Sequence, residues 1–429
     1  MTIPELFHIY QQFPSVQTDS RKVKSGDLFF ALKGENFDGN KFAAQALNDG
    51  AAFAIIDNAA YAFNEQCLLV EDVLVTLQQL ALHHRRQFNI PFIAITGSNG
   101  KTTTKELLHQ VLATKYITYA TEGNLNNHIG VPLTLLKIKQ DAQMAIVEMG
   151  ANHQKEIEFY CTIVEPDFAL ITNVGKAHLE GFGGLEGVKK GKGELYDFIR
   201  NHDGSIFINT DLDYLDEMAK GIAKRITYGS ANAQIIGRIL HQDDFLKFMV
   251  LSSGLETVIQ TQLVGDYNFP NALAAIAVGN YFDIDIDSIK IAIEAYTPSN
   301  SRSQLLSKGS NTLILDAYNA NPSSMKLAIE NISKIQTIKT KWLLLGAMKE
   351  MGASSGVEHQ ALVDLVLRLQ LEHVILVGKE FDEVQHSFLH FGNSVLAKEW
   401  LLEHKIEDAI VLIKGSRGSK MEEVLTAFD

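Results

Sequence analysis

Short apolar runs alternate with longer segments of mixed polarity along most of the chain. In its middle, the runs at 92–95, 144–147 and 168–171 have the length and composition of buried strands. Segments with helical spacing separate them, and strands that alternate with helices are typical of a parallel sheet with crossover helices. Between residues 245 and 264 the pattern is instead that of antiparallel strands. The pattern therefore predicts an α/β protein with a mainly parallel central sheet.

The same pattern divides the chain into three predicted domains, because 429 residues are too many for one hydrophobic core. Residues 1–88 carry short apolar runs broken by Gly, Asn and Asp turns, which predict a small mixed α/β domain. Residues 89–300 hold the predicted parallel sheet and form the second predicted domain. Residues 301–429 again alternate apolar runs with helical segments and predict a Rossmann-like domain. This last domain has no G-x-G-x-x-G after its first strand, so we do not expect it to bind a dinucleotide.

Composition and charge narrow the classes of protein to which the chain can belong. The formal net charge of −13 argues against broad binding to nucleic acid or to an anionic membrane. No apolar run approaches the roughly 20 residues that span a bilayer, and the first residues lack the pattern of a secretory signal. The two cysteines, Cys67 and Cys161, have no CxxC spacing and suit a reducing compartment. We therefore expect a cytoplasmic globular protein.

One glycine-rich stretch, ITGSNGKTTTKE at 95–106, follows a predicted strand and opens a predicted helix. Glycines at such a turn let backbone N–H groups and the helix N-terminus point at phosphate oxygens. Lys101 would contact the β- and γ-phosphates of a nucleotide, and the Thr102 hydroxyl would bind Mg²⁺. The general pattern has a glycine where this chain has Ile95, so the loop is a shorter form, and a plain glycine turn is the alternative. The predicted nucleotide-binding residues of the loop are Gly97, Ser98, Asn99, Gly100, Lys101, Thr102 and Thr103.

Two residues at strand ends are candidates for the same site. Glu148 closes the run at 144–147, and a magnesium ion at a phosphate loop needs a second hard ligand of this kind. His178 follows the run at 168–171, on the side of the sheet where ligands of α/β proteins gather. Each has a plain alternative, because a strand-end glutamate is often only solvated and a single histidine is often structural.

In combination, these stretches resemble the Mur ligase family of peptidoglycan synthesis. The resemblance rests on TGSNGKTT at 96–103, VEMGA at 147–151 and TNVGKAHLE at 172–180. Further matching stretches lie in all three predicted domains, at 19–21, 26–31, 123–132, 178–183, 318–325 and 414–417. The phosphate loop alone is shared with many NTPases, whereas the combination is specific. The Asp-Asn-Pro-Arg signature of the diaminopimelate-adding member is missing from this chain.

The resemblance implies a ligase reaction. In the family, ATP phosphorylates a carboxylate of a UDP-MurNAc-peptide, and an amine attacks the acyl phosphate. For this chain the matching stretches imply UDP-MurNAc-tripeptide and D-alanyl-D-alanine as substrates, with ATP and one or two Mg²⁺ ions as cofactors. The product would serve cell wall biogenesis, and with it cell shape and cell division. No nucleic-acid partner and no membrane insertion are implied, and we expect a monomer.

The resemblance also implies a carbamoylated lysine at Lys192, within VKKGKGEL at 188–195. An ammonium would repel Mg²⁺, whereas a carbamate made from CO₂ could help His178 to hold the ion. The alternative is that Lys192 belongs to a solvated basic face. In the family an alanine usually precedes this lysine, where the chain has Gly191. The expected metal ligands are Thr102, Glu148, His178 and Lys192, and the expected catalytic residues are Lys101, Lys192, His178 and Arg302.

The remaining site residues are also implied by the resemblance. Asn271 is expected near the adenine, Arg302 at the γ-phosphate, and Asp316 near the ribose or Lys101. Asn268 could equally cap the following helix, and Tyr267 stands where the family often has histidine. The residues expected to bind the UDP-MurNAc substrate are Ser20, Arg21, Asn124 and Asn127, although Asn-rich loops are often only turns.

Two other functions stay open at this point. A folylpolyglutamate synthase-like ligase shares the phosphate loop and central fold, but the stretches at 124–132 and 414–417 favour the cell-wall enzyme. A regulatory ATPase with the same loop would bind a partner and form no amide bond. Because Arg302 and Asp316 must reach a nucleotide held by Lys101, we also expect the third domain to move toward the loop on binding.

Overall fold

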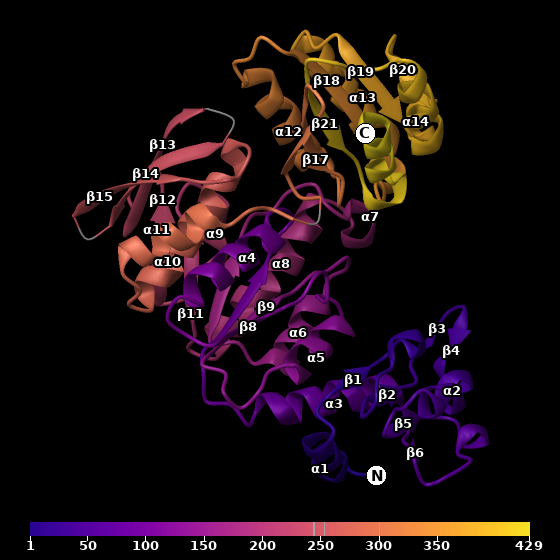
Figure 1. The fold of residues 1–429 in the computed structure, drawn as a ribbon. Coiled ribbons are helices and arrows are strands. Elements are labelled where there is room, and N and C mark those ends of the chain that lie inside the picture. The colour runs from indigo at the N-terminus through magenta and orange to yellow at the C-terminus, as the bar shows by residue number, and fades with distance from the viewer. Residues whose placement is uncertain (243–244, 253, 300) are drawn as a thin grey trace.

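The computed structural model describes residues 1–242, 245–252, 254–299 and 301–429. The chain forms three α/β domains, which follow one another from the lower right of Figure 1 to its top. Each domain is built on a sheet of largely parallel strands. The expected three-domain α/β fold class is therefore confirmed. Within the described ranges, no helix is both long and apolar enough to cross a membrane.

The amino-terminal domain consists of α1 (Ile3–Gln12), β1 (Val16–Gln17), β2 (Leu28–Phe30), β3 (Lys33–Gly34), β4 (Phe37–Asp38), α2 (Ala43–Asn48), β5 (Phe53–Ile56), β6 (Cys67–Leu69) and α3 (Val73–Arg85). Its parallel sheet has the order β1-β2-β5-β6, and β3 and β4 form a separate hairpin. A capping box of Thr2 and Glu5 starts α1, which packs on α3. The Tyr10 hydroxyl of α1 donates to the carbonyl of Leu136 in the central domain. The first helix therefore ties the two domains together.

The central domain consists of β7 (Phe92–Thr96), α4 (Lys101–Leu112), β8 (Thr118–Ala120), α5 (Gly130–Leu136), β9 (Met144–Glu148), α6 (Glu156–Val164), β10 (Phe168–Ile171), α7 (Leu179–Phe182), α8 (Leu185–Asn201), β11 (Ser205–Asn209), α9 (Asp213–Met218), β12 (Lys224–Gly229), β13 (Ile235–Gln242), β14 (Leu246–Ser252), β15 (Leu255–Gln260), α10 (Phe269–Tyr281) and α11 (Ile286–Ala295). Its sheet has the order β15-β14-β13-β12-β11-β10-β7-β9-β8. The strands from β13 to β8 are parallel, and β14 and β15 add an antiparallel edge, as the sequence predicted.

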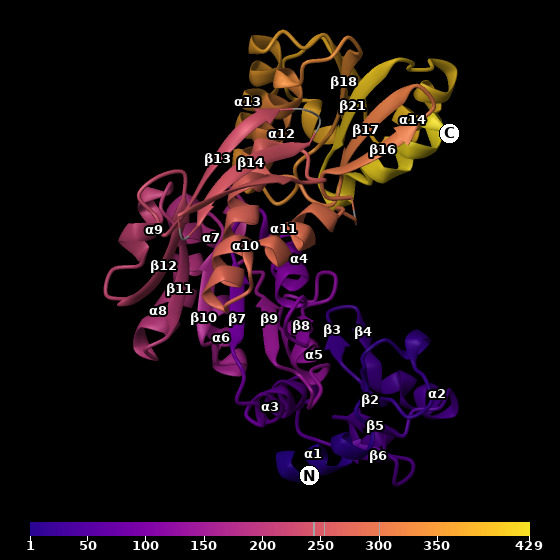
Figure 2. The same cartoon turned by 60° about the vertical axis from the view of Figure 1, so that its left-hand side comes forward.

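Helices cover both faces of this sheet. Ile93 and Ile95 of β7 pack into one core with α4, α10 and α11, and Figure 2 shows α10 and α11 in front of the strands. Phe92 and Ala94 point the other way, into a core with α3, α5, α6 and α8. Because both faces of the sheet are buried, the strands are continuous apolar runs and do not alternate between apolar and polar residues.

The carboxyl-terminal domain consists of β16 (Gln304–Lys308), β17 (Asn311–Asp316), α12 (Pro322–Lys334), β18 (Thr340–Gly346), α13 (Ser355–Arg368), β19 (His373–Val377), β20 (Leu389–Phe391), α14 (Ser394–Glu403) and β21 (Ala409–Lys414). The sheet order is β16-β17-β21-β18-β19-β20, parallel except for the β16–β17 pair. α12 and α13 pack on one face and α14 on the other. The carboxyl ends of β17, β18 and β21 face the central domain, so this sheet edge helps to build the site.

Candidate active site

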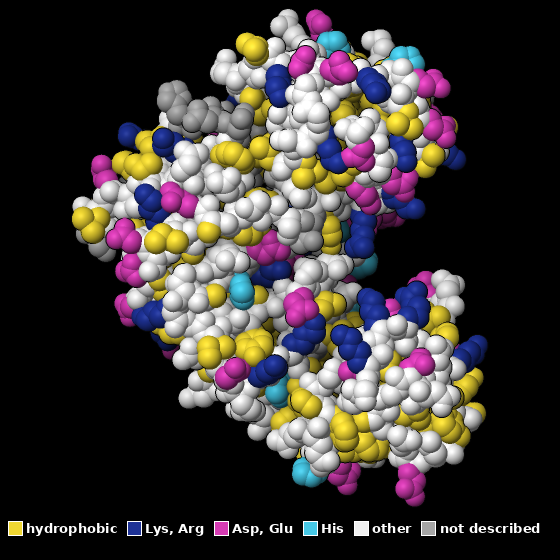
Figure 3. Space-filling view, in the orientation of Figure 1, with side chains coloured by type: hydrophobic (Ala, Val, Ile, Leu, Met, Phe, Trp, Pro, Cys, Tyr) yellow, Lys and Arg dark blue, Asp and Glu magenta, His cyan; other side chains and the backbone are white. Residues whose placement is uncertain are grey.

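A cavity of about 430 Å³ lies where the carboxyl ends of the central strands meet the third domain. Figure 3 shows the molecule hollowed between the amino-terminal and carboxyl-terminal domains on one face. The cavity is lined by residues from the segments 98–103, 124–128, 148–152, 267–271, 302–303 and 316–319, and by Lys414. Ligands of parallel α/β sheets gather at strand ends of this kind. The cavity therefore brings together the phosphate loop and the other strand-end candidates.

The phosphate loop has the backbone that its glycines predict. Gly97 and Gly100 have φ angles of 144° and 80°, and α4 begins at the next residue, Lys101. A methyl group at Gly97 would lie 2.0 Å from the Thr172 hydroxyl, and one at Gly100 would lie 2.6 Å from Asn271 Oδ1. Only glycine fits at either position without a shift. The backbone N–H groups of Ser98 and Asn99 donate to the carbonyl and the side chain of Asn173. The start of α4 is therefore the part of the loop that is open to a phosphate.

Lys101 curls back over this loop. Its Nζ donates to the carbonyl of Gly97 at 2.7 Å, and the side chain lines the cavity. Burial lowers the pKa of the Lys101 ammonium; nearby Glu148 raises it, and Arg302 lowers it further. A phosphate bound at the loop would place a negative charge beside this buried ammonium, so the position of Lys101 fits a phosphate-binding lysine.

Glu148 ends β9 with one carboxylate oxygen unused. Its Oε1 accepts a hydrogen bond from Asn126 Nδ2 at 2.7 Å, and its backbone N–H donates to Thr121 Oγ1 at 2.9 Å. Its Oε2 is buried and has no hydrogen-bond partner among the described residues. The hydroxyl-bearing Thr102 lines the same cavity. A free carboxylate oxygen with a nearby hydroxyl fits Mg²⁺, which takes few protein ligands and completes its shell with phosphate and water.

His178 lies at the cavity edge nearest the third domain. It precedes α7 with a φ of 51°, and its Nδ1 contacts the carboxylate of Glu350. Burial lowers the pKa of His178, Glu350 raises it, and the charges of Lys101 and Lys192 lower it. Across the described residues, no three His, Cys, Asp or Glu side chains gather into a ready-made metal site. A cation near Glu148 and His178 would therefore need ligands from the substrates as well.

Lys192 of α8 is buried rather than solvated, with 1% of its surface exposed. Its Nζ donates to the carbonyl of Ala151 at 3.2 Å and lies 5.0 Å from the Phe182 ring. A methyl group at Gly191 would lie 2.4 Å from that ring, which explains the glycine before this lysine. The alternative of a solvated basic face is therefore wrong for Lys192. The residue lies behind Ala151 and does not itself line the cavity, unlike Thr102, Glu148 and His178.

A chain of amides forms the wall beside α10. Thr104 Oγ1 donates to Asn271 Oδ1 at 3.2 Å, and Asn271 Nδ2 donates to Asn268 Oδ1 at 3.0 Å. Asn268 precedes α10 but makes no side-chain capping bond; its Nδ2 donates to the carbonyl of Val264 instead. The Tyr267 hydroxyl pairs with Ser303 at 2.9 Å. Asn271 therefore lies beside the loop, where the resemblance expects the nucleotide.

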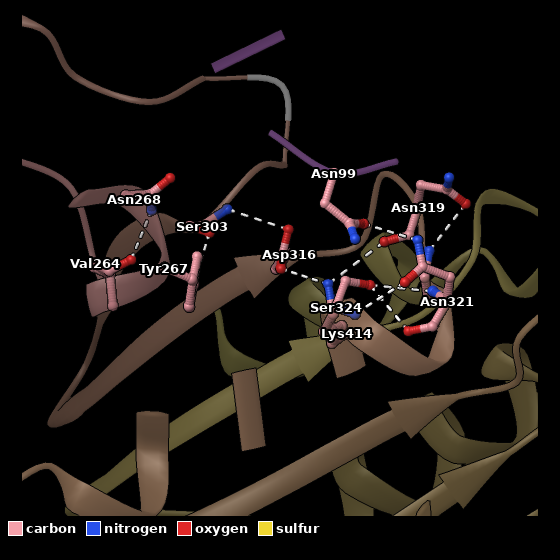
Figure 4. A network of polar contacts seen from close by, with 11 residues as sticks. Asn99, Val264, Tyr267, Asn268, Ser303, Asp316, Asn319, Asn321, Ser324 and Lys414 are labelled. Carbon is pink, nitrogen blue, oxygen red and sulfur yellow. Dashed lines mark hydrogen bonds and ion pairs between the residues drawn. The ribbon is translucent and has the colours of Figure 1, made fainter. Parts of the chain in front are cut away.

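The third domain contributes Arg302 and Asp316, which both line the cavity. Figure 4 shows Asp316 in contact with Lys414, whose Nζ lies 2.5 Å from Asp316 Oδ2. The other carboxylate oxygen of Asp316 accepts from the Ser303 N–H at 3.4 Å. Arg302 stacks on the ring of Tyr318, 3.7 Å from its centroid. Sequence reasoning did not assign roles to Lys414 or Tyr318, although both lie in the quoted stretches at 318–325 and 414–417.

The structure places the residues expected to bind the UDP-MurNAc substrate in two separate regions. Asn124 and Asn127 line the cavity, and Asn127 Oδ1 also accepts from the Gly130 N–H at the start of α5. Ser20 and Arg21 lie in the amino-terminal domain and do not line it. Arg21 is exposed and paired with Asp19 at 2.9 Å. Any ligand that contacts both sets of residues must extend across the hollow between the domains.

Three α/β domains, two of which line one phosphate-loop cavity, define a class, the multidomain nucleotide-dependent enzymes of the P-loop type. Family models then match each domain: the Mur ligase family catalytic domain at residues 12–88, the Mur ligase middle domain at 95–279, and the Mur ligase glutamate ligase domain at 301–417. The chain belongs to the Mur ligase family, and it is an ATP-dependent enzyme that forms amide bonds.

Individual relatives agree with this assignment. The chain is 33% identical over 422 residues to the UDP-N-acetylmuramoyl-tripeptide–D-alanyl-D-alanine ligase of Bacillus subtilis (strain 168), covering 96% of this chain and 92% of that protein. It is 34% identical to the ligase of the same name from Escherichia coli (strain K12), at 96% and 93% coverage. Its fold matches a crystal structure of MurF from Acinetobacter baumannii with a TM-score of 0.87, 33% identity, and coverage of 96% and 93%. MurF ligase from Thermotoga maritima in complex with ADP matches with a TM-score of 0.86, 25% identity, and 96% coverage of both chains.

Proposed function

We propose that this chain joins D-alanyl-D-alanine to the terminal peptide carboxylate of UDP-N-acetylmuramoyl-tripeptide, while ATP becomes ADP and phosphate. The observation that carries the proposal is the set of groups around one cavity: the phosphate loop, the unpartnered Glu148 oxygen and the Arg302 guanidinium. Relatives named for this reaction align with nearly the whole chain, which supports the choice of substrates. The enzyme acts as a monomer in the cytoplasm, in the synthesis of peptidoglycan precursors.

The first step requires an anionic carboxylate to attack an anionic γ-phosphate, so positive charge must lie between them. The N–H groups at the start of α4 and the Lys101 side chain hold the β- and γ-phosphates, and Arg302 reaches the γ-phosphate from the third domain. Glu148 and Thr102 would hold Mg²⁺, which supplies further neutralisation of the phosphates when bound. The carboxylate oxygen bonds to the γ-phosphorus, and ADP leaves with the electron pair of the broken bond. The product is an acyl phosphate.

In the second step the amine of the dipeptide attacks the acyl carbon, and phosphate leaves from the tetrahedral intermediate. The amine must lose a proton as the amide forms. Burial lowers the pKa of His178, which favours the neutral ring that can accept a proton or contribute to cation binding. Asp316 holds Lys414 at the cavity lining, so the charge of that ammonium is already paired with a carboxylate.

We also propose that Lys192 carries a carbamate. Burial lowers the pKa of this amine well below its usual range, and the charge of Lys101 lowers it further. A neutral amine is the form that attacks CO₂, and the reaction releases one proton and leaves an anion on Nζ. That anion would lie behind Ala151, where it could orient groups at the cavity wall.

Phosphate release is the direct test of the ligase reaction. The wild-type protein should release phosphate from ATP only when UDP-MurNAc-tripeptide and D-alanyl-D-alanine are both present, and mass spectrometry should find the pentapeptide product. A Lys101→Ala variant provides the control, because it should release none in any mixture. Release that ignores both substrates would instead identify a regulatory ATPase. Release that follows a folate substrate and glutamate would identify a folylpolyglutamate synthase-like enzyme.

A further inference from the structure

Arg302 lies between two residues whose backbone conformation is unfavourable. Ser301 and Ser303 have φ angles of 56° and 48°, in the left-handed region that residues with a side chain rarely adopt. Such a conformation costs free energy and persists only where the surrounding contacts fix it. The contacts of these two serines therefore decide where the Arg302 side chain begins.

The third domain supplies part of these contacts. The carbonyl of Ser301 accepts from the Tyr318 N–H at 3.3 Å, and the centroid of the Tyr318 ring lies 3.7 Å from the guanidinium carbon of Arg302. The N–H of Ser303 donates to Asp316 Oδ1 at 3.4 Å. These contacts hold Arg302 within its own domain, whereas the phosphate loop belongs to the central domain. A contact that crosses between the two domains is needed to fix the arginine relative to the loop.

Tyr267 of the central domain makes such a contact. Its hydroxyl pairs with the hydroxyl of Ser303 at 2.9 Å, and Figure 4 shows this pair beside the bond from Ser303 to Asp316. The Tyr267 ring packs against the chain at Gly265, where a methyl group would lie 2.4 Å from a ring carbon. Burial raises the pKa of the Tyr267 hydroxyl and the charge of Asp316 raises it further, so the hydroxyl stays protonated. The pair is enclosed, since Ser303 is only 7% exposed.

The same wall of the central domain continues to the phosphate loop. Tyr267 directly precedes Asn268, whose Oδ1 accepts from Asn271 Nδ2 at 3.0 Å. Asn271 Oδ1 in turn accepts from Thr104 Oγ1 at 3.2 Å, and Thr104 lies near the start of α4. A short series of hydrogen bonds therefore leads from the start of α4 to the residue beside Tyr267, and the Tyr267 hydroxyl carries it across the domain boundary to Ser303.

We propose that Tyr267 is a positioning residue that sets the distance between the Arg302 guanidinium and the phosphate loop through its bond to Ser303. The inference rests on the proposed function, in which Arg302 contacts the γ-phosphate of a nucleotide held at the start of α4. A charge-assisted hydrogen bond to an anion is about 2.7–2.9 Å long, and a displacement of about 1 Å is enough to break it. Without the Tyr267 bond, Ser303 can leave its left-handed conformation and carry the guanidinium away from the phosphate.

The test compares two nucleotides by calorimetric titration in the presence of Mg²⁺. The non-hydrolysable analogue AMP-PNP carries the third phosphate group, and ADP lacks it. Tyr267→Phe removes one hydroxyl and should weaken AMP-PNP binding by about fivefold or more, with ADP affinity within about twofold of wild type. Arg302→Ala should show the same selective loss to a larger degree. Tyr116→Phe is the matched control, because its hydroxyl donates to the carbonyl of Phe282 at 2.9 Å, away from the cavity lining, and no change is expected.

Further variants separate positioning of Arg302 from a general role in the fold. Ser303→Ala removes the same bond from its other side, so it should reproduce the selective loss, and the double variant should lose no more than either single one. In an Arg302→Ala background, Tyr267→Phe should cause no further loss of AMP-PNP affinity. A further loss in that background, or equal losses for AMP-PNP and ADP in Tyr267→Phe alone, would overturn the inference.

The same experiment separates this inference from the function on which it rests. A selective loss of AMP-PNP affinity in Arg302→Ala, with none in Tyr267→Phe, would refute the inference and leave the proposed function in place. A wild-type protein that binds both nucleotides but forms no amide bond in the phosphate-release test would instead refute the proposed function.

Discussion

At the residue scale, burial decides which ionisable side chains have a shifted pKa. Lys192 and Lys189 lie on the same helix, but only Lys192 is nearly without solvent contact. Lys189 Nζ lies 3.2 Å from the carboxylate of Glu217, whereas Lys192 faces a carbonyl and an aromatic ring. Burial lowers the pKa of Lys192 well below its usual range, which favours the neutral form of this amine. That difference makes its carbamate a testable chemical proposal.

Replacing Lys192 by alanine should lower kcat by about a hundredfold or more, since the anion that the carbamate supplies is lost. Formate or acetate should partly restore the rate by occupying the vacated space. Lys190→Ala is the matched control, because Lys190 is exposed on the same helix and its loss should change little. The measurement is the rate of pentapeptide formation, with thermal unfolding as the check on folding. A deficit that no carboxylate repairs, with a wild-type rate unaffected by removal of CO₂, would show that the unmodified amine is the working form.

Sequence reasoning identified residues whose neighbours are close in the chain, and it missed pairs formed by distant segments. Lys101 and Thr102 follow directly from the loop pattern, and both line the cavity. Asp316 was expected near the ribose or Lys101, but its partner in the structure is Lys414, which is 98 residues away. A pattern read along the chain does not show which strand ends lie side by side. The pairing of β17 with β21 brings these two residues together.

At the scale of elements, the unit of β7, the phosphate loop and α4 was predictable because its signals are local. A buried apolar run, two glycines and a lysine specify a strand, a turn and a helix start within the span 92–112. The docking of α1 on α3 and the hydrogen bond from Tyr10 to the carbonyl of Leu136 in α5 were not predictable, because both join segments that are distant in the chain. The order of the nine-stranded sheet likewise depends on which helices cross over. A local sequence pattern therefore predicts individual strands and helices, whereas packing between distant segments decides which of them become neighbours.

A glycine within this unit allows a matched test. In Gly100→Ala the new methyl group would meet Asn271 Oδ1 at 2.6 Å, and the φ of 80° disfavours any side chain. Gly26→Ala has a similar backbone cost at a φ of 89°, but nothing lies within 4 Å of its methyl group. Both variants should lose about 1 kcal/mol of unfolding free energy from the backbone. Only Gly100→Ala should also weaken ATP-analogue binding, by about tenfold, since the loop N–H groups must shift.

Calorimetric titration with an ATP analogue and thermal unfolding measure the two effects separately. Equal analogue affinity in both variants would contradict the view that the loop backbone itself holds the phosphates. A loss of affinity that is confined to Gly100→Ala would agree with it.

At the scale of the whole molecule, polar contacts join the third domain to the phosphate loop. Asn321 Nδ2 donates to Asn99 Oδ1 at 2.8 Å, and Lys176 pairs with Glu358 across the same boundary. The central and third domains have largely separate hydrophobic cores, although Leu179 packs against both. In this ion pair the Lys176 side chain is half-exposed and that of Glu358 is mostly buried. The expected movement of the third domain on binding stays a prediction, and these polar contacts are the ones that it would have to exchange for contacts with the ligands.

Small-angle scattering tests this movement directly. With an ATP analogue and UDP-MurNAc-tripeptide present, the radius of gyration should fall, because both ligands add bridges between the phosphate loop and Arg302. Glu358→Gln removes the charge that pairs with Lys176, so the ligand-free protein should become more open and its radius should rise. Glu372→Gln changes the charge of an exposed glutamate in the same domain and should leave the radius unchanged. A radius that responds neither to the two ligands nor to Glu358→Gln would mean that the domains are already fixed in their catalytic arrangement, since the same contacts would then persist with and without substrate.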